Sequence, residues 1–421
     1  MYYTRVLSNG VTVVAENMAS VRSVAFGIWV RGGSRAESVG GASHFLEHMM
    51  FRGTHRRSGA QIAQEMDAIG GHVNAFTSKE HTCYYTLTLD EHLDTAMDVL
   101  ADMFFSSKLA EEDIAKEKDI IFEEIDMVED TPDDLIFDVM QESVWGDSAL
   151  APPILGTKES VNSITQDVLR SALCCSPSDV VVAVAGNFGG MEELISKIDA
   201  LFGREWATPA PRNSSKPTIY TPKIIARHKP IEQLHMLLGF PGVEVGSEQR
   251  YDMAVLNTIL GAGMSSVLFQ RIREEMGLAY AVYSHNSSFS DTGILYIYAA
   301  VSTQNAKAAL SAILEETTSL PDLSQDTLRH AQAQIKSSLL LNLESTQSRM
   351  VRIGRGHITL GEVAGLDEIS EGIEAVSLDS LRRLMSETLK PSAMSLSAVG
   401  PIEAKDMAGL KDLVGGYGLS A

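Results

Sequence analysis

The stretch His44-Phe-Leu-Glu47-His48 contains two histidines and a glutamate, side chains that can bind a metal or transfer protons. On a helix these three positions lie three and four residues apart, so their side chains share one face. Two imidazoles one turn apart can chelate a single Zn²⁺, and the carboxylate between them can reach a water molecule on that metal. Catalytic zinc has three protein ligands and one open position. The sequence therefore predicts a zinc site whose third ligand comes from elsewhere in the chain.

Two candidates for the third ligand lie on the helix expected over residues 111–129. Glu117 and Glu124 are seven residues, or two helical turns, apart and therefore share a face. Ile120 and Ile121 lie close to that face and are expected to turn it inward. A buried carboxylate is costly unless it is paired or bound to a metal. The spacing leaves both glutamates open as ligands.

A structural or surface role is the alternative for the histidine motif, because histidines four residues apart often lie on solvated helix faces. The neighbours Leu46, Met49, Met50 and Phe51 are apolar enough to bury this helix. Six of the 11 histidines also fall within residues 44–92, namely His44, His48, His55, His72, His81 and His92. These observations favour zinc.

The sequence around these residues predicts a mixture of strands and helices. Strand-like runs cover residues 11–16, 23–30, 83–89, 180–185, 234–239, 293–300 and 394–399. Helical stretches cover residues 58–69, 92–105, 111–129, 132–145 and 324–347. Strands follow strands with helices between them, and strict β-α-β alternation is absent. This pattern indicates an α+β fold, in which mainly antiparallel sheets pack with helices in two-layer domains.

Matching signals in the two halves indicate that these domains are homologous. Residues 177–186 and 391–400 each run from a Pro-Ser pair through an apolar stretch to a glycine nine positions later. Just upstream, residues 165–167 and 377–379 each begin with Thr or Ser and end with Asp two positions later, a pattern typical of a helix start. Agreement in order and spacing favours a duplicated domain.

Length and composition support two domains. A chain of 421 residues exceeds the ~250–300 residues at which single cores stop growing. Residues 206–223 are polar and hold four of the 13 prolines, which predicts a semi-rigid linker. We therefore expect an N-terminal zinc-binding catalytic domain over residues 1–205, the linker over 206–223, and a homologous C-terminal domain over 224–421.

The net charge of −21 excludes some partners. Nucleic-acid and anionic-membrane binding both need lysine and arginine in excess, so an acidic chain favours neutral or basic partners. Residues 253–270 carry too many polar groups for a membrane span and are expected to form a buried helix and loop. The N-terminus shows no leader pattern. The three cysteines, Cys83, Cys174 and Cys175, lack framework spacing, so we expect reduced thiols and a cytoplasmic location.

The motif H-x-x-E-H, followed by Glu124 76 positions after His48, is the inverted form of the zincin signature. In this arrangement the chain resembles the pitrilysin/insulinase metallopeptidase family. It is most similar to the half-length branch with the bacterial processing proteases and the β subunit of the mitochondrial processing peptidase. The resemblance implies one zinc per chain, held by His44, His48 and Glu124. Glu47 would be the general base, and Glu117 would orient the site.

The resemblance extends over essentially the whole chain. Other stretches that match the family are residues 9–11, 32–35, 49–54, 70–77, 117–129, 155–157 and 273–280. It implies that Arg273 and Tyr280 of the second half contact the substrate carbonyl, where both can stabilise a developing oxyanion. From the residues alone, the alternatives are a surface salt bridge of Arg273 with Glu274 or Glu275, and a core position for Tyr280.

Two further groups of residues are expected to bind substrate. Asn74, Ala75 and Phe76 match the family's edge strand, to which an extended peptide adds as another strand; an ordinary hairpin is the alternative. Asp134 and Asp138 match the acidic positions that recognise a substrate arginine in the processing-peptidase branch. Solvated acids at a helix start are the alternative for this pair.

The resemblance implies a zinc endopeptidase that cleaves short or unfolded peptides. Relatives of twice this length close four such domains into a chamber, so a homodimer is expected here. Two other functions stay open: a non-catalytic scaffold subunit of a larger complex, and an active subunit that requires a different partner chain. The intact motif and the Arg273/Tyr280 pair favour a self-sufficient peptidase. Residues 252–268 lack a second H-x-x-E-H, which predicts a single zinc.

Overall fold

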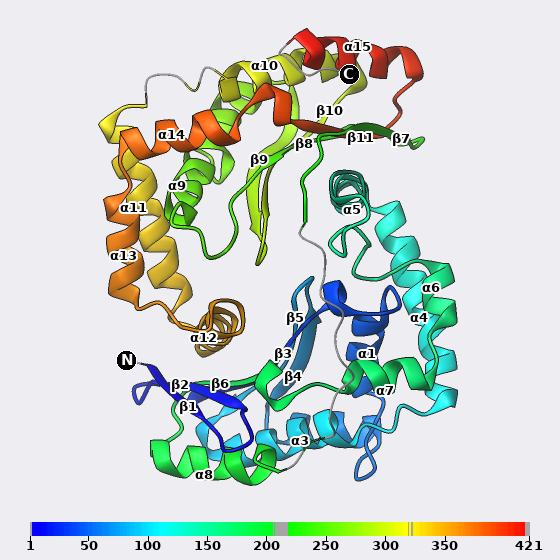
Figure 1. Cartoon of the computed structure of the whole chain (residues 1–421), viewed down its shortest axis with the longest axis vertical. Helices are drawn as coiled ribbons and strands as arrows, with labels where there is room; N and C mark the ends of the chain where they lie inside the picture. Colours follow the sequence, from blue (N-terminus) through cyan, green and yellow to red (C-terminus); the bar gives the residue numbers. More distant parts are fainter. Residues whose placement is uncertain (1, 205, 207–217, 319, 321–322, 417–421) are drawn as a thin grey trace. The chain divides into compact units, whose positions relative to one another are not determined.

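The computed structural model describes residues 2–204, 206, 218–318, 320 and 323–416 (Figure 1). The chain forms two compact units that are discontinuous in sequence. The first unit comprises Met1–Asp126, Pro152–Ser215 and Leu340–Gly365, and the second comprises Met127–Ala151, Lys216–Leu339 and Leu366–Ala421. Residues 207–217 of the expected linker lie outside the described residues. No helix in the described ranges is long and apolar enough to cross a membrane.

The first unit is built on a six-stranded sheet in the order β1-β2-β6-β3-β5-β4. Its strands are β1 Tyr2–Val6, β2 Thr12–Asn17, β3 Ser23–Arg31, β4 His72–Thr77, β5 His81–Leu89 and β6 Val180–Gly186. Only β2 and β6 pair in parallel; the other neighbours are antiparallel. The valine-rich β6 is buried along its whole length, as expected for a strand covered on both faces.

Helices cover both faces of this sheet. One face packs with α1 Ala42–Met50, α2 Gly59–Ala68, α3 Leu93–Ser106, α7 Gln166–Leu173 and α8 Met191–Phe202. Side chains that alternate along the same strands, such as Ala25 and Trp29 of β3, point to the other face and pack with α12 Thr346–Leu360. The long helix α4 Glu111–Asp130 and the short α6 Lys158–Ser163 also precede β6 in the chain.

The second unit has a five-stranded sheet in the order β7-β11-β8-β10-β9. Its strands are β7 Ile224–His228, β8 Leu234–Pro241, β9 Ala279–Ser288, β10 Gly293–Val301 and β11 Ser395–Gly400. Only β7 and β11 pair in parallel. One face packs mainly with α9 Arg250–Gly261, α10 Ala306–Thr318, α14 Leu378–Thr388 and α15 Ala404–Gly416; α11 Gln325–Asn342 and α13 Leu366–Ala375 also contribute. The other face packs with α5 Pro132–Trp145 (Figure 1).

Each half of the chain therefore gives one helix to the other half's sheet. Helix α5 belongs to the first half and packs on β8 and β11, while α12 belongs to the second half and packs on β2, β3 and β6. The expected contiguous halves each contain one sheet, but these two helices lie with the sheet of the opposite half. Hydrophobic periodicity marks a buried helix face without saying which sheet buries it.

The α+β fold is confirmed, and most element ends agree with expectation to within a few residues. The helix expected over residues 324–347 is wrong as a single element, because it divides into α11 and α12. The break has a local cause: Ser345 accepts a hydrogen bond from the Ser348 amide and so begins a new helix. The helix starts expected from the repeat are present, since Thr165 and Ser377 cap α7 and α14.

Candidate metal centre

Helix α1 carries the central motif and owes its orientation to an apolar face. Ala42, Phe45, Leu46, Met49 and Met50 are buried in the core of the first unit. The remaining face presents His44, Glu47 and His48, which are partly buried. The amphipathic pattern that packs the helix therefore also turns its polar groups together, away from the core.

Three potential ligands converge above this face. His44 Nε2 lies 3.7 Å and His48 Nε2 lies 3.6 Å from Glu124 Oε2 on α4. The three ligand atoms lie within 4.8 Å of one another, and this is the only such group of metal-binding side chains in the described part of the chain. Burial, with a smaller effect of His48, lowers the pKa of His44 to about 4. His44 is therefore neutral near pH 7, the form that binds a metal.

The structure separates the roles of the two glutamates that the spacing left open. Glu124 joins the histidines, whereas Glu117 is buried behind His48 and accepts a 2.8 Å hydrogen bond from its Nδ1. Arg52 donates from Nε to the other oxygen of Glu117. Burial alone would raise the pKa of Glu117, but the bonds from His48 and Arg52 lower it. A carboxylate that accepts the hydrogen bond of the Nδ1–H group leaves Nε2 of His48 free to bind a metal.

Glu47 lies on the same helix face, within electrostatic reach of His48 and Glu124. Its Oε2 accepts a 2.5 Å hydrogen bond from Thr77 Oγ1 on β4. Burial raises the pKa of Glu47 above its ordinary value, against the opposing effect of Thr77. A carboxylate with a raised pKa, held beside a candidate metal site, suits proton transfer.

The donor set fits zinc. Imidazole nitrogens and a carboxylate oxygen are all donors that Zn²⁺ accepts, and three protein ligands leave one position open, as in catalytic sites. His48 is further oriented by Glu117, which is the usual outer partner of a metal-binding histidine. His44, His48 and Glu124 would hold the ion.

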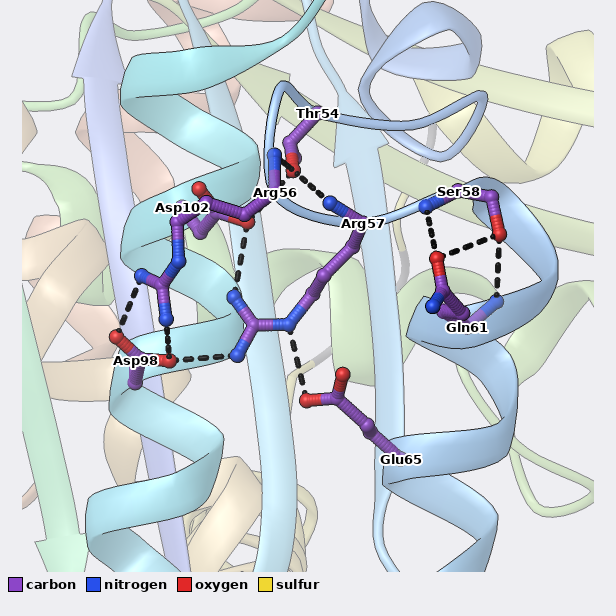
Figure 2. A network of polar contacts seen from close by, with 8 residues as sticks. All are labelled: Thr54, Arg56, Arg57, Ser58, Gln61, Glu65, Asp98 and Asp102. Carbon is purple, nitrogen blue, oxygen red and sulfur yellow. Dashed lines mark hydrogen bonds and ion pairs between the residues drawn. The ribbon is translucent and has the colours of Figure 1, made fainter.

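Behind α1, a network of charges anchors the loop that follows the helix (Figure 2). The buried Arg57 bonds to Glu65 of α2 and to Asp98 and Asp102 of α3. Arg56 forms a two-point bond with Asp98. At the start of α2, Ser58 and Gln61 form a capping box that is visible in the same view. These bonds fix the loop to α2 and α3 and leave the metal ligands untouched.

The expected peptide-docking residues lie on an edge strand. β4 contains Asn74, Ala75 and Phe76 and pairs only with β5 in the described sheet. Its other edge has no strand partner among the described residues, which is the geometry that strand addition requires. Phe76 packs edge-on against Trp29 and near Tyr85, with ring centroids 5.5 and 6.3 Å away.

The other expected substrate residues belong to the second unit. Tyr280, on β9, is 76% exposed, so the alternative core position is excluded. Arg273 lies on the π-helical stretch η4 Phe269–Glu275, with its guanidinium 4.8 Å from the Phe269 ring and 3.8 Å from Glu274. Asp134 and Asp138 lie one turn apart on α5, the first exposed and the second partly buried.

Sequence reasoning missed three residues of this region. Arg52, Thr77 and Glu37 contact Glu117, Glu47 and the start of α1, respectively. Thr77 falls inside a stretch that matches the family, which is a signal that could have found it. The expectation that both isoleucines beside the glutamates face inward is wrong for one: Ile121 is buried, but Ile120 is 40% exposed.

Known proteins resemble the chain over most of its length. An uncharacterized zinc protease of Bacillus subtilis is 46% identical, covering 89% of this chain and 93% of that protein. An uncharacterized zinc protease of Streptomyces coelicolor is 38% identical, covering 97% and 91%. A protease of Helicobacter pylori has the same fold, with a TM-score of 0.85 at 20% identity, covering 95% of this chain and 99% of that one.

Two family models together match most of the sequence. The model described as insulinase (peptidase family M16) matches residues 12–158, which include every candidate metal ligand. The model described as peptidase M16 inactive domain matches residues 172–335. The division agrees with a motif that occurs only in the first half. The chain belongs to the insulinase family, peptidase family M16.

Proposed function

We propose that this protein is a zinc-dependent endopeptidase. The observation that carries the proposal is the convergence of His44, His48 and Glu124 within 4.8 Å, with Glu47 on the same helix face. A structural zinc site would use four protein ligands. Three ligands next to a partly buried carboxylate of raised pKa favour a site that activates water.

Each residue of the site has a role in peptide hydrolysis. Zinc, when bound, would supply a Lewis acid that polarises the scissile carbonyl and lowers the pKa of a water molecule toward ~7. Glu47 accepts the proton of the attacking water and delivers it to the leaving amine. Thr77 holds the Glu47 carboxylate in place, and Glu117 holds the ring of His48.

The substrate is an extended peptide that adds to the free edge of β4. Backbone pairing supplies affinity without strict sequence demands, which favours short or unfolded peptides of varied sequence. The family resemblance supports three further parts of the proposal. Arg273 and Tyr280 donate to the substrate carbonyl, Asp134 and Asp138 favour basic side chains, and two copies of the chain form the chamber in which cleavage occurs.

A non-catalytic scaffold subunit is the competing function. A scaffold has no need of a water-activating site, whereas this chain retains three convergent ligands and Glu47 with its own bond to Thr77. The retained chemistry favours an enzyme.

The test is the substitution Glu47→Gln in the purified full chain. It should keep one zinc per chain and lower the cleavage rate of a fluorogenic peptide by about 10²–10⁴-fold, which is the usual contribution of general acid–base catalysis. The matched control is Glu123→Gln, an exposed glutamate beside Glu124, which should change neither. Hydrolysis at the wild-type rate by Glu47→Gln would refute the general-base role. Chelator-insensitive hydrolysis would refute the zinc mechanism.

A further inference from the structure

The start of α1 is held by a carboxylate from outside the helix. Gly41 is the N-cap residue and has no side chain to satisfy the first amides. Instead, Glu37 Oε1 accepts from the Gly41 amide at 2.7 Å, and its Oε2 accepts from the Ser43 amide at 2.8 Å. Free amides at a helix start need such acceptors, and negative charge there is favourable. The next residue after Ser43 is the potential ligand His44.

Glycine is required at this start. Gly41 has φ of 88°, and an added Cβ would lie 2.5 Å from the Leu155 carbonyl oxygen. A residue with a capping side chain cannot replace it without strain. The capping acceptor must therefore come from another part of the chain, and Glu37 supplies it.

The segment that carries Glu37 is itself bound to the turn between β4 and β5. The amides of Gly32, Ser34 and Arg35 donate to the carbonyls of Glu80, Ser78 and Lys79 at 2.7, 3.0 and 2.7 Å. The Arg35 guanidinium pairs with Glu80 at 2.6 Å. One short segment thus connects the hairpin that contains the docking strand to the helix that contains two of the three candidate ligands, His44 and His48.

Ser43 reinforces this connection from the helix side. Its hydroxyl donates to the Gly33 carbonyl at 3.0 Å, so the segment and the first turn of α1 are bonded in both directions. Gly33 packs so tightly on the turn that an added Cβ would lie 2.2 Å from the Ser78 carbonyl oxygen. Burial raises the pKa of Glu37 to about 7, while the Ser43 and Gly41 amides and Lys79 oppose the shift. Burial thus disfavours the charged form of this carboxylate, and its bonds to the Ser43 and Gly41 amides are the main interactions that stabilise it.

We propose that Glu37 is a positioning residue of the peptidase: by binding the Gly41 and Ser43 amides, it fixes the start of α1, and with it His44, relative to the β4–β5 hairpin. This inference rests on the proposed function, since it assigns Glu37 to the alignment of the docked peptide with the zinc ligands. Glu37 touches neither ligand nor substrate in this role. Its loss should misplace His44 and lower turnover more than peptide binding.

The experiment compares Glu37→Ala and Glu37→Gln with Asp98→Asn in the full chain. Asp98 anchors the loop at the other end of α1 through Arg56 and Arg57, so its variant is a control for lost stability (Figure 2). We expect Glu37→Ala to lower kcat per bound zinc by about 10–100-fold, with KM within about twofold of wild type. Glu37→Gln, which keeps one acceptor oxygen, should fall between. Asp98→Asn should lower Tm and leave kcat per bound zinc unchanged.

Hydrogen exchange of residues 41–50, measured by mass spectrometry, gives a readout that needs no activity. Exchange should accelerate in Glu37→Ala and stay at the wild-type rate in Asp98→Asn. Unchanged exchange in Glu37→Ala overturns the inference, as does an equal loss of kcat in Asp98→Asn at the same loss of Tm. A wild-type chain that binds zinc but cleaves no peptide refutes the proposed function instead, and the exchange comparison still decides whether Glu37 fixes α1.

Discussion

The two units repeat one architecture, but among the described residues the candidate metal centre occurs in the first unit alone. Leaving out β1, the first sheet runs β2-β6-β3-β5-β4 and the second runs β7-β11-β8-β10-β9, each with one parallel pair at the same position. Helix α1 connects β3 to β4 together with α2, and α9 occupies the corresponding connection between β8 and β9. The fold therefore supplies the same frame twice.

The difference lies in the side chains of the corresponding helices. The polar face of α1 presents His44, Glu47 and His48, whereas the polar residue Asn257 of α9 accepts a 2.8 Å hydrogen bond from Ser284 of β9. In unit 1 the helix is linked to its edge strand through Glu47 and Thr77; in unit 2 the corresponding link is a structural hydrogen bond. Chemistry in this fold therefore depends on a few side chains and not on the frame.

The largest effect should come from removing a ligand in the first unit. His48→Ala should abolish zinc binding and lower peptide cleavage by at least about 10³-fold, beyond the 10–100-fold typical of outer-sphere changes. Asn257→Ala, at the corresponding helix, should retain one zinc and near wild-type activity. Zinc content by atomic spectroscopy and peptide cleavage measure both. Zinc loss in Asn257→Ala would show that the metal site does not depend on the first unit alone.

Helices α5 and α12, which each pack on the sheet of the opposite half, should contribute similarly to the stability of the two units. Met350 on α12 lies with its sulfur 3.4 Å from the Trp29 indole nitrogen, and Met140 on α5 lies 3.7 Å from the Ser397 hydroxyl; both are fully buried. Truncation of either to alanine should cost about 2–5 kcal/mol of unfolding free energy. Denaturant melts measure the loss. Met127→Ala, at a 63% exposed position, is the control and should change little.

Acid should destabilise the first unit through His81, the first residue of β5. The second unit has no histidine at the corresponding position, because the first residue of β10 is Gly293. Burial, with a contribution from Arg355, lowers the pKa of His81 from 6.5 to about 4. The unfolded chain then binds more protons than the native one between pH 6.5 and 4, so stability falls as pH falls through this window.

The variant His81→Phe keeps an aromatic ring beside Trp29 and Phe76 and lacks this proton linkage. Relative to wild type it should gain stability as pH falls from 6.5 to 4, by at most about 3 kcal/mol at 1.36 kcal/mol per pKa unit. Melting curves across pH test this. The exposed His55→Phe should follow wild type, and a constant difference across pH would contradict the linkage.

The smallest expected effects are those of alanine substitutions at two glycines of α12. An added Cβ at Gly354 would lie 2.1 Å from the Trp29 indole nitrogen, whereas at Gly356 the nearest atom is 3.4 Å away. Gly354→Ala should destabilise by about 1–3 kcal/mol through overpacking. Gly356→Ala should be neutral or stabilise by up to about 1 kcal/mol through helix propensity. Thermal melts of the pair measure how closely α12 approaches the sheet.

Local patterns predicted much of this molecule because local rules govern them. The apolar spacing over residues 42–50 predicts a helix with three polar groups on one face, and Thr131-Pro132 predicts the start of α5. Ser345 shows where this reasoning failed, since a capping serine inside a continuous helical pattern divided α11 from α12. Short-range hydrogen bonds compete closely with helix propagation, so such breaks are hard to read from periodicity.

Local sequence specifies the shared face of His44, Glu47 and His48, because helix geometry places side chains three and four residues apart on one side. The repeated helix and strand signals likewise indicate two similar halves, and the residue types indicate a zinc site. The family resemblance already pointed to Glu124 as a ligand and to Glu117 as the residue that orients the site. The fold adds how each acts: Glu124 lies with the two histidines, and Glu117 bonds to His48. Only the tertiary structure shows the bond from Thr77 to Glu47 and the cap that Glu37 supplies to α1. Packing between distant segments also places α5 and α12 each on the sheet formed by the other half of the chain. These outcomes depend on which face of one element meets another, and that is set by packing between segments far apart in the chain.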